Sequence, residues 1–137
     1  MIATIFSGTR SATALIALAL LALTGSAQAA YEEILNVSGS PIPAGVPTEK
    51  IRAAIVTGGA QRGWVMQDEG PGHLLATLNV RSHTVRADIR FDGQTYSITY
   101  RDSENMKFKK GKIHGAYNKW VRNLDADIQR ALLLVAL

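Results

Sequence analysis

The chain has 137 residues, 47% of them hydrophobic, with 15 Lys and Arg against 11 Asp and Glu and no Cys. This length and composition are typical of one globular domain. The lack of cysteine excludes disulfide scaffolds, cysteine-ligated zinc sites, cysteine nucleophiles and a lipid anchor on cysteine. The net charge of +4 suits anionic partners but does not by itself identify one.

Residues 1–29 show the order of segments that is typical of a secretory signal peptide. Arg10 precedes the apolar run Ala12–Leu23, and Ala27-Gln28-Ala29 follows as a cleavage site of the A-x-A type. The apolar run is too short for a membrane-spanning helix, which needs about 20 residues. We therefore expect cleavage after Ala29, export to the periplasm, and no transmembrane segment in the mature chain.

Residues 30–46 contain several residues that interrupt regular structure, among them Gly39, Pro41 and Gly45. This composition predicts a flexible lead in front of the folded part. The folded part is expected to be a single α+β domain over residues 47–137.

The first helix is predicted to begin at Pro47 or Thr48, because proline is favourable at a first helical position. Apolar residues recur at helical spacing between Ile51 and Ile55. Gly58-Gly59 is predicted to end the helix, since glycine readily adopts the backbone conformation found at helix C-termini.

Four runs of two-residue alternation follow, over residues 64–67, 74–81, 84–91 and 95–101, and each predicts a strand. Asp92-Gly93 between the last two runs is a preferred type I′ hairpin turn. Such closely spaced runs favour an antiparallel meander with one apolar face.

A long last helix is predicted from apolar residues at helical spacing between Ile113 and Leu132. Trp120 lies centrally on this apolar stripe and Asn118 on the opposite side, while the apolar end 132–137 is expected to complete the core. The predicted fold is α+β, with a four-stranded antiparallel meander and an N-terminal and a C-terminal helix packed on one face, in the order α-β-β-β-β-α.

A set of short motifs resembles a family of small exported proteins of Gram-negative bacteria. The motifs are Arg62-Gly63-Trp64, Asn79-Val80-Arg81-Ser82-His83, Tyr96-Ser97-Ile98-Thr99-Tyr100, Asp102-Ser103-Glu104-Asn105, Ile113-His114 and Tyr117-Asn118-Lys119-Trp120-Val121. Many members are described as lipoproteins, and no activity is established for them. The resemblance covers about residues 47–132 and implies an envelope location and a small α+β domain. It does not extend to a lipid anchor, because this chain lacks the cysteine.

Antiparallel topology brings the turn after the second strand next to the end of the fourth. His83 and Asp102 should therefore gather at one edge, and His114 could join them, whereas His73 belongs to the opposite end. Two imidazoles and a carboxylate can bind a ligand or a metal ion, so a small metal-dependent or hydrolytic enzyme is the alternative function. The structural alternative is that His83 and Asp102 orient the hairpins by hydrogen bonds. We predict no catalytic residue, resident metal or cofactor.

Two basic surfaces are the other candidates. Four lysines within Lys107–Lys112 precede the last helix, where cations oppose the helix dipole. Arginines add a second basic surface along the polar face of the strands. Arginine can bind phosphate bidentately and lysine as a point charge. The alternative is a solvated face that only keeps the protein in solution.

The leading hypothesis is a non-enzymatic binding or interaction protein of the envelope. Its partner would be an anionic envelope component or another envelope protein, and nucleic acid is not expected. The candidate ligand-binding residues are Arg81, His83, Arg86, Arg90, Arg101, Asp102, Lys109, Lys110, Lys112 and His114.

Overall fold

The computed structural model describes residues 31–137, so the predicted signal peptide, residues 1–29, lies outside the described residues. Two strands precede the first helix of this part of the chain, and five strands separate it from the second. In chain order they are β1 (Tyr31–Glu33), β2 (Val37–Pro41), α1 (Thr48–Ala60), β3 (Val65–Asp68), β4 (His73–Val80), β5 (His83–Phe91), β6 (Thr95–Glu104), β7 (Lys112–His114) and α2 (Ala116–Val135).

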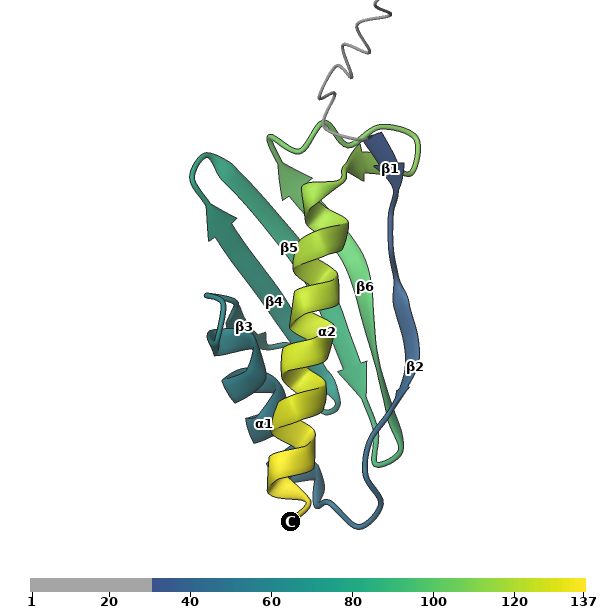
Figure 1. The fold of residues 1–137 in the computed structure, drawn as a ribbon, viewed down its shortest axis with the longest axis vertical. Helices are drawn as coiled ribbons and strands as arrows, with labels where there is room; N and C mark the ends of the chain where they lie inside the picture. Colours follow the sequence, from purple (N-terminus) through teal and green to yellow (C-terminus); the bar gives the residue numbers. More distant parts are fainter. Residues whose placement is uncertain (1–30) are drawn as a thin grey trace, which may run out of the picture.

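The larger sheet is antiparallel and has five strands in the order β2-β6-β5-β4-β3, while β1 and β7 form a separate two-stranded sheet. Both helices lie in front of the same face of the larger sheet, and α2 crosses it along much of its length (Figure 1). The predicted α+β class is thus confirmed. The predicted meander corresponds to β3, β4, β5 and β6, whose neighbours in the chain are neighbours in the sheet.

The predicted flexible lead is wrong for residues 31–33 and 37–41, which form β1 and β2. Strand β2 pairs with β6, with Val37 opposite Ile98, and makes the sheet five-stranded instead of four-stranded. An edge strand needs ladder hydrogen bonds on one side only, so it tolerates Gly39 at φ 63 and an end at Pro41. Because two strands precede it, α1 is not the N-terminal element of the fold.

The connection between β5 and β6 also differs from the prediction, because Gly93 does not adopt the positive φ of a type I′ turn. Instead, the Asp92 carboxylate accepts the N–H of Gln94 at 2.7 Å and of Thr95 at 2.8 Å. The hydrogen bonds from Thr95 and Gln94 hold the pKa of Asp92 below its ordinary value of 3.8. The side chain of Asp92 therefore organises this turn.

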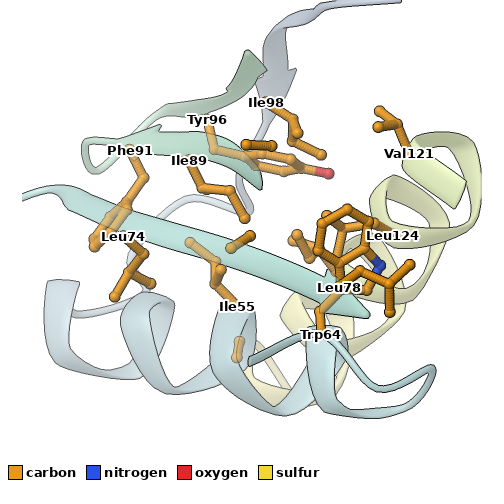
Figure 2. Close-up of a cluster of buried hydrophobic side chains, with 14 of the residues drawn as sticks. Ile55, Trp64, Leu74, Leu78, Ile89, Phe91, Tyr96, Ile98, Val121 and Leu124 are labelled. Atoms are coloured by element: carbon orange, nitrogen blue, oxygen red, sulfur yellow. The ribbon is translucent and has the colours of Figure 1, made fainter. Parts of the chain in front are cut away.

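The core lies between the sheet and the two helices. Figure 2 shows Ile55 of α1, Trp64, Ile89 of β5 and Leu124 of α2 converging between the layers, all of them buried. Apolar surface removed from water contributes about 25 cal/mol per Å² to folding. The two-residue period of the strands and the helical period of α2 thus meet in one apolar layer.

Helix α1 continues through Gly58-Gly59 to Ala60, so the glycines do not end it as predicted. A Cβ atom added at Gly58 would lie 3.0 Å from the backbone oxygen of Asp127 and 3.0 Å from Cα of Ile128, both in α2. Glycine at this position therefore allows the two helices to approach closely.

Asn118 is buried, although the sequence placed it on the solvent side of α2. Its Oδ1 atom accepts the N–H of Leu35 at 2.9 Å. Its Nδ2 atom donates to the backbone oxygen of Glu33 at 2.8 Å and to Oε2 of Glu32 at 2.9 Å. This amide attaches the segment between β1 and β2 to α2.

Two further predictions for α2 are corrected. Trp120 is only partly buried and packs at the margin of the core. At the end of the helix Leu132 is buried, but Leu133 is 61% and Leu134 is 65% exposed, so the apolar end does not complete the core. Among residues 31–137 no helix has the length and apolar character needed to cross a membrane.

Candidate functional site

Residues Lys107–Lys112, called the lysine hairpin below, fold back on themselves just before α2. The Lys109 N–H donates to the Lys112 oxygen at 2.9 Å, and the Lys112 N–H donates to the Lys109 oxygen at 3.0 Å. Lys110 and Gly111 between them have φ 51 and φ 76. Two consecutive positive φ angles define the type I′ turn. Because Lys109 and Lys112 lie directly opposite each other, their side chains leave the same face of the hairpin.

Strand β1 holds the lysine hairpin in place. It pairs with β7, with Glu33 opposite Lys112. The Ile34 N–H donates to the Gly111 oxygen at 3.2 Å, and the Tyr31 hydroxyl donates to the Lys109 oxygen at 3.3 Å. The hairpin is therefore a supported turn at the end of the molecule where α2 begins (Figure 1).

The four lysines of the hairpin are exposed. Within residues 31–137, no carboxylate oxygen lies within 4.0 Å of their ammonium groups. Two aromatic side chains are exposed at the same end, Phe108 at 50% and Tyr31 at 45%. Exposed aromatic rings combined with cations are typical of surfaces that meet a membrane–water interface.

The arginines of the larger sheet are, in contrast, partly neutralised. Arg86 contacts Asp102 at 2.7 Å and Glu104 at 3.5 Å. The hydrogen bond to Asp102 is the main reason that the pKa of the Arg86 guanidinium is raised. Arg81 lies in the β4–β5 turn with φ 54, and neither it nor Arg90 has a carboxylate within 4.0 Å in the described part of the chain.

Arg101 lies in a second ion-pair group on the sheet. It contacts Asp88 at 3.2 Å and Glu69 at 3.2 Å. Asp88 also contacts Nε2 of His73 at 2.6 Å, so this buried carboxylate has polar partners on two sides. With four carboxylates among the arginines, the sheet does not present the strongly basic surface that the sequence suggested.

The predicted edge site is assembled only in part. The ring centroids of His83 and His114 are 6.4 Å apart. Nδ1 of His83 lies 2.7 Å from the Asn105 oxygen, and Nδ1 of His114 accepts the Ala116 N–H at 3.1 Å. The Asp102 carboxylate is instead paired with an arginine. Among residues 31–137 no three His, Asp or Glu side chains gather closely enough to hold a metal ion.

A hollow of about 240 Å³ adjoins this edge and is lined by both tryptophans, Trp64 and Trp120. Trp120 connects it to the edge, because its ring centroid lies 6.4 Å from that of His83. His83 therefore lies between His114 and the aromatic margin of the core at Trp120.

A larger groove of about 440 Å³ lies beside the lysine hairpin. It is lined by Glu33, Ile34, Asn36, Tyr100, Phe108, Lys110, Gly111 and Lys112. The rings of Tyr100 and Phe108 stack within it, with centroids 5.0 Å apart and an interplanar angle of 26°. The groove thus combines an apolar aromatic surface with the cations of the hairpin.

The sequence pattern predicts Lys110 and Lys112 as binding residues but does not predict the opposite wall of this groove. That wall, residues 33–36, was assigned to the flexible lead. Ile34 and Leu35, with Val37, were the available signal, because adjacent apolar residues in a polar segment indicate contact with a core.

Fold and site together define a small α+β domain that presents a lysine hairpin beside an open groove. The chain matches no known protein family, and it has no significant similarity to a curated protein or to a solved structure. The resemblance to small exported proteins therefore stays a prediction.

Proposed function

We propose that this protein is a non-enzymatic binding protein of the bacterial envelope that attaches to acidic lipid surfaces through the lysine hairpin. Export to the periplasm is part of the proposal and is supported by the signal-like order of residues 1–29 and by the resemblance to exported proteins. The observation that carries the proposal is the exposure, at one end of the molecule, of four lysines without carboxylate partners together with two aromatic rings.

The expected strength of this attachment is modest. A lysine near an anionic membrane surface contributes about 1 kcal/mol. Four of them contribute about 4 kcal/mol, which corresponds to a dissociation constant near 1 mM. Phe108 and Tyr31 add to this, because half-exposed aromatic rings are favourable at the membrane interface. The attachment is therefore reversible and sensitive to salt.

Vesicle binding tests the proposal. Protein recovered after export is mixed with vesicles of neutral phospholipid, with or without an acidic phospholipid. Binding should require the acidic lipid. It should weaken as salt shortens the Debye length from about 30 Å at 0.01 M to about 8 Å at 0.15 M.

A matched pair of variants separates the hairpin from the total charge. Lys109→Gln/Lys110→Gln removes two hairpin lysines without altering β7 and should weaken binding about thirtyfold, the equivalent of about 2 kcal/mol. Lys50→Gln/Arg122→Gln removes two exposed cations elsewhere and should weaken it less than about threefold. Equal losses for the two variants, or equal binding to neutral and acidic vesicles, would contradict the proposal.

A further inference from the structure

The groove beside the lysine hairpin has the size of a small-molecule site. Its volume of about 440 Å³ falls within the range of about 300–1,000 Å³ found for ligand pockets. One wall is the hairpin, and the other is the backbone between β1 and β2. Both walls are fixed, because the Ile34 N–H donates to the Gly111 oxygen across the groove at 3.2 Å.

The apolar part of the groove rests on stacked aromatic side chains. Phe108 stacks on Tyr100, and Tyr100 meets the buried Tyr117 edge-on, with ring centroids 5.3 Å apart and an interplanar angle of 89°. The Tyr100 hydroxyl lies 2.8 Å from Oγ of Ser103. Half of Phe108 nevertheless stays exposed, although burying a phenyl ring is favourable. This fixed aromatic surface, extended by Ile34, suits an aliphatic chain.

The polar part of the groove favours an anion. Lys110 and Lys112 carry two positive charges, and Glu33, opposite Lys112, carries one negative charge. Oδ1 of Asn36 accepts the Tyr100 N–H at 3.0 Å, which leaves the NH₂ group of this amide as a donor for a ligand. The lining therefore has one net positive charge and a neutral donor next to an apolar surface.

From this combination we infer that the groove binds single molecules of an anionic amphiphile, a phosphate monoester with an alkyl or acyl chain. The phosphate interacts with Lys110 and Lys112, and the chain covers Phe108 and Ile34. This inference rests on the proposed function, because the hairpin would then bind both an acidic lipid surface and one molecule of that surface. Inorganic phosphate has the negative charge of this ligand without its chain, and an alkyl ammonium ion has the chain without the negative charge.

Titration with hexyl phosphate, which is monomeric in water, tests the inference. Binding is followed by the amide NMR signals of Gly111 and Asn36, with inorganic phosphate and hexylammonium as the other probes. Hexyl phosphate should bind about tenfold more tightly than inorganic phosphate, because about two methylene groups become buried. Hexylammonium should not shift these signals.

Three variants and a control locate the ligand. Phe108→Ala should weaken hexyl phosphate binding about five- to tenfold, while Phe108→Leu, which keeps an apolar side chain, should stay within about threefold of wild type. Leu133→Ala truncates an exposed apolar side chain near the C-terminal end of α2, outside the groove, and it should change binding less than about twofold. Glu33→Gln removes a repelling charge and should strengthen binding about threefold.

The inference is overturned if inorganic phosphate binds as tightly as hexyl phosphate, if Phe108→Ala and Leu133→Ala weaken hexyl phosphate binding equally, or if Glu33→Gln weakens it. Salt-dependent vesicle binding without hexyl phosphate binding also overturns it but leaves the proposed function standing. Hexyl phosphate binding without vesicle binding would overturn the proposed function and leave this inference standing.

Discussion

The close approach of α1 and α2 at Gly58 gives a sharp test of the packing. Gly58→Ala and Gly59→Ala place the same methyl group at adjacent positions of one helix. At Gly58 the new Cβ would meet backbone atoms of Asp127 and Ile128 at 3.0 Å. At Gly59 it would meet Cε of Met66, which is the far end of a flexible side chain.

Both substitutions should stabilise the helix itself, but only one of them should force the new methyl group against atoms that cannot move. Replacing glycine by alanine within a helix stabilises it by about 0.8–1 kcal/mol. Overpacking against atoms that cannot move costs about 1–3 kcal/mol, and this cost applies to Gly58 because its neighbours are helix backbone. Met66 can turn away at little cost. Gly58→Ala should therefore lower the free energy of unfolding by about 0–2 kcal/mol, whereas Gly59→Ala should leave it unchanged or raise it by up to about 1 kcal/mol.

Thermal and denaturant unfolding of the two variants provide the measurement. A difference of 1 kcal/mol shifts the melting temperature by about 4–8 °C in a domain of this size. Gly59→Ala should melt above Gly58→Ala, with similar denaturant m-values. If Gly58→Ala proves at least as stable as Gly59→Ala, the helices do not make this contact.

Four further substitutions test the interior. The Tyr117 hydroxyl is buried without a hydrogen-bond partner within residues 31–137, so Tyr117→Phe should raise the free energy of unfolding by about 1 kcal/mol; a lower melting temperature would contradict this. Asn118→Ala leaves the Leu35 N–H unpaired, which should cost about 1–3 kcal/mol and accelerate hydrogen exchange at Leu35, and unchanged exchange would refute the contact. Trp64 is 3% exposed, so Trp64→Ala should lower the free energy of unfolding by about 3–5 kcal/mol. Trp120 is only partly buried, so Trp120→Ala should lower it by about 1–3 kcal/mol. Equal destabilisation by the two substitutions would contradict the different burial of the two tryptophans.

The meander and both helices could be predicted because their signals are local. Alternation along a strand such as β5 and the helical spacing of α2 report directly which side faces the core. Strand β2 could not be predicted in this way. Its Ser, Gly and Pro content is unfavourable for a strand, and pairing with β6, far along the chain, overrides that local preference.

The candidate site shows the same division. The lysines were recognised from the local sequence alone, and the structure adds that none of them forms an ion pair within the described residues. For Arg86 and Arg101 the acids that matter come from other strands and loops, so no local pattern revealed the compensation. Asn118 was misassigned for the same reason, because its partners lie more than 80 positions away.

The pairing of the two ends of the domain has a consequence for folding order. The hydrogen bond between Leu35 and Asn118 closes a loop of 83 residues, and the entropy of such a closure opposes folding by about 4 kcal/mol in a flexible chain. The hairpins of β4, β5 and β6 close much shorter loops and should form earlier, which hydrogen exchange during refolding would show as late protection of β1. The segment around Leu35, near the start of the domain, therefore makes its contact with α2 only after that last helix is in place. Strand β1 supports the lysine hairpin only after that final step. The hairpin should therefore be held in its binding conformation only when the whole domain has folded.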